Sequence, residues 1–245
     1  RGGTGGPAEL ITSRERWHKT GGGGTLRASI FGISDGLVSN TSLVMGFAGA
    51  STGADFILLA GLAGLLAGAF SMAAGEYVSM RAQRELFERQ IELERSELES
   101  MPEEEAKELS LIYQAKGFPK AEADATAARL MENPEIALDT LVREELGLDP
   151  SELGSPWGAS GGSFVAFAFG AMVPVVPFFF GSAATGVVAL SAALSGLALF
   201  GVGAGVSLFT GRSALYSGAR QVALGAAAAA VTYGIGSLIG ASTSV

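Results

Sequence analysis

One carboxylate, Asp35, lies in an otherwise uncharged stretch of the sequence that runs from Ala28 to Ala54. If this stretch crosses a bilayer, the carboxylate costs about 2.5 to 3.5 kcal/mol to insert, so such groups usually face a bundle interior or a wet cavity. Carboxylates in that position mark ion or proton paths. Asp35 is therefore a candidate ligand for a transported cation and a candidate proton carrier.

Met72, Glu76 and Met80 recur at every fourth position further along the chain. In a helix this spacing puts a thioether, a carboxylate and a second thioether along one stripe, which could line a path. Methionine is also a common filler of apolar cores, so packing remains the alternative for Met72 and Met80. A carboxylate with a nearby thioether favours a borderline transition ion such as ferrous iron over calcium. Glu76 joins Asp35 as a candidate proton carrier.

Two pairs of glutamates follow at helical spacing, Glu94 with Glu97 and Glu105 with Glu108. Residues three apart share one face of a helix, where like charges repel by roughly a few tenths of a kcal/mol unless a cation intervenes. Clustered carboxylate oxygens suit hard or borderline divalent ions. The alternative is a solvated acidic helix face, because glutamate is a good helix former and charge runs usually lie at the surface.

Five stretches of the chain are apolar and long enough to cross about 30 Å of hydrocarbon as helices. They are approximately Leu26 to Ala50, Asp55 to Met80, Ser163 to Phe180, Val187 to Thr210 and Gln221 to Ile239. Their many small residues allow close helix contacts in lipid. The sequence therefore predicts an all-α protein, a five-span transmembrane helical bundle with a cytoplasmic helical metal-binding insert. The expected parts are an N-terminal cytoplasmic segment at 1–25, spans one and two at 26–80, the acidic insert at 81–150, and spans three to five at 151–245.

Basic residues set the expected orientation, because short loops rich in lysine and arginine tend to stay in the cytoplasm. Basic residues precede the first span, follow the second, and flank the connection between the fourth and fifth: Arg14, Arg16, Lys19 and Arg27; Arg81 and Arg84; Arg212 and Arg220. The connections at 51–55 and 181–186 contain none. This pattern predicts a multi-pass membrane protein with a cytoplasmic N-terminus, a cytoplasmic insert and a C-terminus on the far side.

The insert carries most of the charge, since residues 81–150 hold 18 of the 24 acidic residues and nine of the 16 basic ones, a net charge of −9. Such a surface repels nucleic acid and concentrates cations, so no nucleic-acid partner is expected. Within the insert, Pro102 opens a second helix, a Lys-Gly-Phe-Pro stretch at 116–119 ends it, and two more helices are expected over 121–132 and 134–145. Packing against a second copy would help so small and charged a domain.

The sequence lacks the residues that common catalytic motifs require, since it has no cysteine, no Walker-type lysine loop and only one histidine. For that histidine, His18, a surface or interfacial role is expected. No enzymatic activity and no prosthetic group are therefore expected. Pro174 and Pro177 remove backbone donors within the third span and should kink or break it. The freed carbonyl groups could line an ion cavity, and a simple packing kink is the alternative.

Three motifs occur in order in this sequence: SDGLVS at Ser34–Ser39, GAFSMAAGEYVS at Gly68–Ser79, and EELGL at Glu144–Leu148. Together they resemble the vacuolar iron transporter family, and the match runs from about Trp17 to the C-terminus. The resemblance implies a homodimer of five-span subunits that exchanges ferrous iron, and often manganese, for protons and moves the metal out of the cytoplasm. Divalent metal would then be the substrate.

The resemblance also implies roles for individual residues. An aspartate and a methionine line the translocation path of the family's dimer, and they correspond to Asp35 and Met72, with Glu76 near the entrance. Cytoplasmic glutamates gather the metal, and those positions match Glu94, Glu97, Glu105, Glu108 and Glu145. One departure concerns the two methionines that accompany the last glutamate in plant members, because Leu141 and Val142 stand in their places and put softer ligation in doubt.

Two other functions remain open at this stage. One is a membrane-tethered buffer or sensor of divalent metal, in which the insert binds metal and the spans only anchor it. The other follows from bacterial relatives that carry a ferritin-like di-iron domain ahead of the first span, because residues 1–25 could be the remnant of such a junction. The chain would then be the membrane part of an iron-oxidising exporter. The resemblance to bacterial members favours a bacterial plasma membrane.

Overall fold

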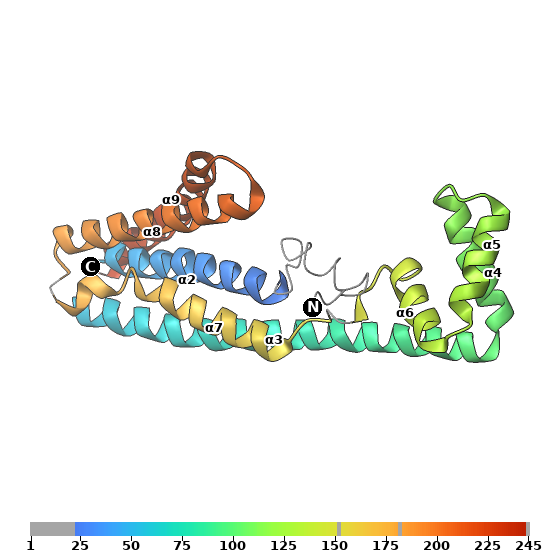
Figure 1. The fold of residues 1–245 in the computed structure, drawn as a ribbon. Coiled ribbons are helices and arrows are strands. Elements are labelled where there is room, and N and C mark those ends of the chain that lie inside the picture. Colours follow the sequence, from blue (N-terminus) through green and yellow to red (C-terminus); the bar gives the residue numbers. More distant parts are fainter. Residues whose placement is uncertain (1–22, 151–152, 181–182, 244–245) are drawn as a thin grey trace, which may run out of the picture. The chain divides into compact units, whose positions relative to one another are not determined.

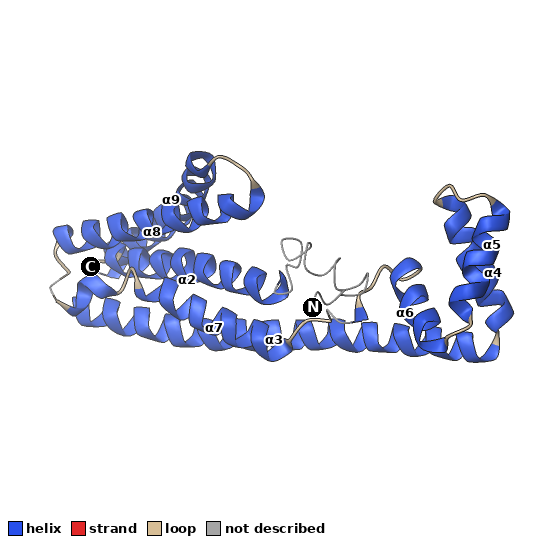
Figure 2. Ribbon diagram, in the orientation of Figure 1, coloured by secondary structure: helices blue, strands red, loops and turns tan. Residues whose placement is uncertain are grey.

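The computed structural model describes residues 23–150, 153–180 and 183–243, and within these residues all regular secondary structure is helical (Figures 1 and 2). This confirms the all-α prediction for that part of the chain. Residues 1–22, with His18 and most of the expected N-terminal segment, lie outside it. The described residues form two compact units, an apolar unit within residues 23–78 and 155–243 and an acidic unit within residues 79–154.

The apolar unit consists of long helices. They are α2 (Gly23–Gly49), the first part of α3 (Ala54–Ser100), α7 (Pro156–Met172), the short 3₁₀ helix η2 (Val176–Phe179), α8 (Thr185–Thr210) and α9 (Ala214–Thr243). Among the described residues, α3, α8 and α9 are long and apolar enough to cross a membrane. The other two expected spans fall on α2, with 27 residues, and on α7 with its 17 residues followed by η2. Five membrane crossings therefore stay a prediction.

Close helix packing around α2 organises the apolar unit, because α2 contacts α7, α8 and α9 (Figure 1). Glycines make the contact with α7 possible. A Cβ atom at Gly36 would overlap with the carbonyl oxygen of Phe167, and a Cβ atom at Gly170 would overlap with that of Ile33. Small residues at such positions let two helix backbones approach closely in a bilayer. The position of Asp35, next to Gly36, therefore depends on this contact.

We expect Gly36→Ala to lower the free energy of unfolding by at least about 1 to 3 kcal/mol, because the added methyl group must push α2 away from the α7 backbone. Thermal unfolding in detergent micelles measures the loss. Gly161→Ala is the control, because it lies on α7 where a Cβ would meet nothing within 4 Å. Equal unfolding temperatures for the two variants would contradict the packing described.

The chain breaks after α7, as the two prolines of this segment predict. Helix α7 ends at Met172, and residues 173–175 form a turn that leads into η2. The tighter turn leaves carbonyl oxygens without their helical donors, and side chains of other helices supply replacements. Asn40 Nδ2 donates to the Ala171 oxygen at 2.5 Å, and Ser191 Oγ donates to the Pro174 oxygen at 2.6 Å. These two carbonyl groups thus accept hydrogen bonds that join α7 and its break to α2 and α8.

The acidic unit consists of residues 79–100 of α3 and three short helices, α4 (Pro102–Ala115), α5 (Lys120–Met131) and α6 (Pro134–Glu144). Pro102 and Pro134 open their helices, where a missing N–H costs nothing, and Asn133 caps α6 by accepting from two backbone N–H groups. Gly117, with φ of +99°, follows the end of α4. Buried Leu109, Ala127 and Leu141 form the core of these helices. The helix positions agree with those expected from the sequence to within one residue at each end.

Candidate metal-binding sites

Residues of α2, α3 and α7 line an open cavity of about 350 Å³ that brings Asp35 and Met72 together. Its lining residues are Asp35, Ser39, Asn40, Leu43, Gly64, Gly68, Ser71, Met72 and Phe167. Oxygen and sulfur donors thus face one space within an otherwise apolar bundle. A carboxylate with a thioether suits a borderline divalent ion, so the cavity has the donor types that the sequence analysis expected of a metal path.

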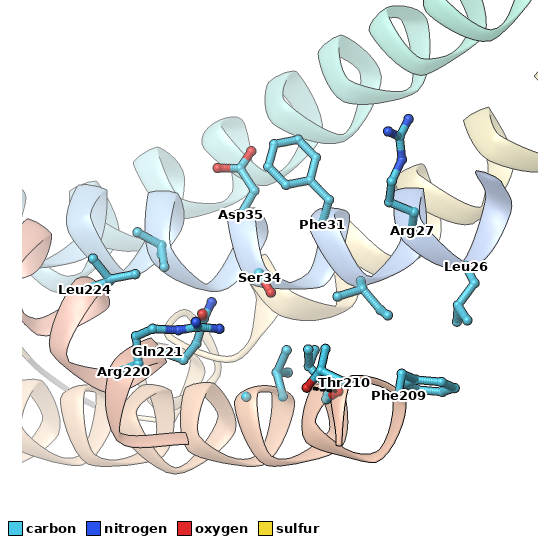
Figure 3. Close-up of a pocket in the computed structure, with 15 residues that line it drawn as sticks. Leu26, Arg27, Phe31, Ser34, Asp35, Phe209, Thr210, Arg220, Gln221 and Leu224 are labelled. Atoms are coloured by element: carbon cyan, nitrogen blue, oxygen red, sulfur yellow. Dashed lines mark hydrogen bonds between the residues drawn. The ribbon is translucent and has the colours of Figure 1, made fainter. Parts of the chain in front are cut away.

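Asp35 also borders a second cavity, of about 660 Å³, whose other walls come from α8 and α9 (Figure 3). Figure 3 shows Arg27, Phe31 and Asp35 projecting from α2, with Arg220 and Gln221 coming from α9. No basic side chain in the described part of the chain forms an ion pair with Asp35. A half-buried carboxylate with no ion-pair partner among the described residues could hold a mobile cation, either a metal ion or a proton.

The rest of the methionine stripe does not share the Asp35 cavity. Glu76 is half-buried and is not among the residues that line this space. Met80 is buried, at 5 % exposure, and its methyl group packs against Gly154 in the acidic unit. The packing alternative therefore holds for Met80, whereas Met72 lines the cavity. Helical spacing alone could not separate these two roles.

A second group of donors lies in the acidic unit, where Glu94 of α3, Glu105 of α4 and Glu145 at the end of α6 converge. One carboxylate oxygen from each lies within 4.8 Å of the others. The cap residue Asn133 starts α6, and the N–H of Glu145 closes the helix by donating to the Leu141 oxygen. The junction at Met101 turns the chain from α3 into α4. Three different helix segments thus position the cluster.

The two central carboxyl groups are almost fully shielded from solvent, with Glu94 at 3 % exposure and Glu105 at 5 %. Burial raises the pKa of Glu94 to about 7, and the charges of Glu145, Glu105 and Glu97 add to the effect. The pKa values of Glu105 and Glu145 are raised as well, again mainly by burial. Among the described residues, Glu94 Oε1 and Glu105 Oε2 have no hydrogen-bond partner. The Glu94 and Glu105 side chains do hydrogen-bond to each other, so a proton relieves part of the cost of burying them. A bound cation would relieve that cost as well.

Glu97 and Glu108 lie outside this three-residue cluster. Both side chains are exposed, and they act on it through their charges, which raise the pKa of Glu145. Leu141 and Val142 are fully buried in the core. The ligand set in the cluster is therefore made of carboxylate oxygens, which suits hard and borderline divalent ions.

The metal-free acidic unit is expected to be more stable in mild acid than in mild base. Glu94 has a pKa of about 7 when folded and 4.5 as its reference value, so between these values the folded state binds the proton more tightly. Stability therefore falls as the pH rises through this window and levels off above it. Thermal unfolding followed by circular dichroism, with a chelator present, measures the trend. An unfolding temperature that rises across the same window would contradict it.

The structure adds residues to the Asp35 cavity that the sequence analysis did not single out, namely Ser39, Asn40 and Ser71. Asn40 is the most buried of them, at 2 % exposure. The one indication in the sequence was that Asn40 is a polar amide within an apolar span. Its role depends on a hydrogen bond to the oxygen of Ala171, which lies 131 residues further along the chain, just before α7 ends.

Comparison with known proteins gives consistent matches over most of the chain. A model of the VIT family matches residues 26–237. The "Vacuolar iron transporter" of Acanthamoeba castellanii is 38% identical over 232 residues, which cover 90% of this chain and 82% of that protein. "Vacuolar iron transporter 1" of Oryza sativa subsp. japonica is 31% identical, covering 87% of this chain and 84% of its own. "Vacuolar iron transporter 1" of Arabidopsis thaliana is also 31% identical, with coverage of 86% and 84%.

Proposed function

This chain belongs to the VIT family, and on that premise we propose that it is a metal transporter that exchanges ferrous iron, and also manganese, for protons. Metal leaves the cytoplasm, the active form is a homodimer in a lipid bilayer, and no chemical reaction is catalysed. Relatives at 31 to 38% identity carry the name vacuolar iron transporter, which supports iron as a substrate.

The observation that carries this proposal is the cavity in which Asp35 and Met72 meet. In the apolar unit, a carboxylate without an ion-pair partner among the described residues supplies charge, and a thioether supplies a softer donor. The carboxylate can bind either a proton or a divalent ion, and binding of one lowers its affinity for the other. That competition is the physical basis of exchange at one site.

The acidic unit is proposed to gather metal on the cytoplasmic side. Glu94, Glu105 and Glu145 would hold the ion directly, while Glu97 and Glu108 raise the local negative potential. Because the pKa of Glu94 is about 7, metal binding near neutral pH displaces a proton, and acid weakens the binding. Glu76, half-buried in the apolar unit, is proposed to lie near the entrance of the membrane path.

The location and orientation rest on the pattern of basic residues. Arg27 and the basic residues before it precede α2, and Arg212 and Arg220 flank the start of α9. With the positive-inside rule, this pattern supports five crossings, a cytoplasmic N-terminus and a cytoplasmic acidic unit. A bacterial plasma membrane is our proposal for the membrane that holds the protein.

A membrane-tethered metal buffer is the second candidate function, and the separate compactness of the acidic unit favours it, because that unit holds its glutamate cluster by itself. Flux of ferrous iron and manganese into proteoliposomes separates the two functions. A transporter moves metal at a rate that increases with an imposed proton gradient. Stoichiometric binding of metal without flux would leave the buffer as the better account.

A further inference from the structure

Asn40 is a buried amide in the wall of the cavity that contains Asp35 and Met72. Resting on the transport function proposed above, we propose that the side-chain oxygen of Asn40 is a third ligand of the cation that passes through this cavity. The ligand set would then be a carboxylate oxygen, an amide oxygen and a thioether sulfur from two neighbouring helices, α2 and α3. The argument rests on how the amide is oriented and on what surrounds its oxygen.

Two hydrogen bonds fix the orientation of the Asn40 amide. Its Nδ2 donates to the Gly61 oxygen of α3 at 3.2 Å and to the Ala171 oxygen of α7 at 2.5 Å. Carbonyl oxygens accept hydrogen bonds and cannot donate them, so the NH₂ group must face these two atoms. The Oδ1 atom is thereby held on the opposite side of the amide. The break in α7 contributes directly, because it leaves the Ala171 oxygen without its helical donor.

The Oδ1 atom itself has no hydrogen-bond partner within the part of the chain that the structure describes. A buried acceptor in this state costs free energy unless water or an ion satisfies it. Gly64, another lining residue, leaves space beside it, since a Cβ there would lie 2.9 Å from Oδ1 and 2.5 Å from Leu43 Cδ2. The missing side chain at Gly64 therefore keeps the oxygen open to an occupant of the cavity.

An amide oxygen changes which metal the cavity prefers. Carbonyl and carboxylate oxygens suit manganese, whereas thioethers suit softer ions. A neutral oxygen also adds a ligand without adding charge, so it strengthens binding of the ion without holding a further proton. Asn40 therefore favours the harder of the two proposed substrates, and its loss should penalise manganese more than ferrous iron.

The test compares Gly64→Ala with Gly75→Ala in the full chain reconstituted in proteoliposomes, with manganese and ferrous iron as substrates. The Gly64 methyl group would cover Oδ1 while both amide donor bonds remain, whereas a Cβ at Gly75, on the same helix, would meet nothing within 4 Å. For Gly64→Ala we expect the KM for manganese to rise about tenfold, with a smaller rise for iron. The unfolding temperature should fall only slightly, because the end of the Leu43 side chain, 2.5 Å from the added Cβ, can move aside. Gly75→Ala should behave as the native chain.

Asn40→Leu provides a second variant, because it removes the oxygen together with both donor bonds. We expect the same selective rise in the manganese KM, accompanied by a lower unfolding temperature. If Asn40 only joins the helices, Asn40→Leu will lower stability and maximal flux equally for both metals, and Gly64→Ala will leave both KM values unchanged. That result would overturn the ligand role while native flux persists. Absence of flux in the native chain would overturn this inference together with the transport function.

Discussion

Asp35→Asn is expected to reduce proton-driven flux of iron and manganese at least about tenfold while leaving the helical fold intact. Asparagine keeps the shape of the side chain and removes the charge that would hold the cation and the proton. Because Asp35 has no ion-pair partner among the described residues, its replacement leaves no protein cation unpaired. Initial rates of metal uptake into proteoliposomes measure the effect.

Asp55→Asn is the matched control for this prediction. Asp55 is a carboxylate of the same unit, exposed in the first turn of α3 and absent from the lining of the Asp35 cavity. Its replacement removes the same charge from the protein and should leave flux near the native rate. If Asp35→Asn transports as well as Asp55→Asn does, the membrane path proposed here is wrong.

The triple change Glu94→Gln, Glu105→Gln and Glu145→Gln is expected to weaken metal binding by about a thousandfold, since each of the three charged ligands lost costs roughly a tenfold factor. The same variant should unfold at a higher temperature than the native chain in mild base without metal. Its glutamines remove the buried charges and the repulsion that raise the pKa values of the cluster. Isothermal titration of the full chain in detergent and thermal unfolding give the two readouts.

A control triple separates the cluster from the general acidic field. Glu99, Glu104 and Glu135 are exposed and lie on α3, α4 and α6, the three helices that position the cluster. Their replacement by glutamine changes the net charge by the same amount and should change affinity only slightly. Equal losses of affinity in the two triples would show that the surface potential, and not the buried cluster, attracts the metal.

Much of this fold could be predicted from the sequence, because its signals are local. Pro102, Pro134 and Gly117 mark the starts and stops of the short helices, and the structure places them there. The break near Pro174 was expected from its missing N–H and its ring. Asp35 and Met72 were found as chemistry-bearing residues in apolar surroundings, and the structure brings them to one cavity.

Other features depend on contacts between distant segments and were not predictable. Helical spacing placed Glu94 with Glu97 on one face, but only Glu94 is buried, because packing of α4 and α6 decides which side of that face is covered. Glu145 was expected among the metal-gathering glutamates from the family resemblance alone, because its spacing from Glu94 and Glu105 in the sequence does not show that the end of α6 brings it to them. The role of Asn40 requires the turn after α7, where one carbonyl group loses its helical donor.

The most direct test of the central claim records metal and protons together in proteoliposomes that contain the native chain and a pH-sensitive dye. Vesicles with an acidic interior are given ferrous iron or manganese outside. The proposed exchange predicts that metal accumulates while the interior becomes more alkaline, and that collapsing the gradient slows accumulation. Metal that binds without entering, or that enters with no change in internal pH, would contradict proton-coupled transport by this protein.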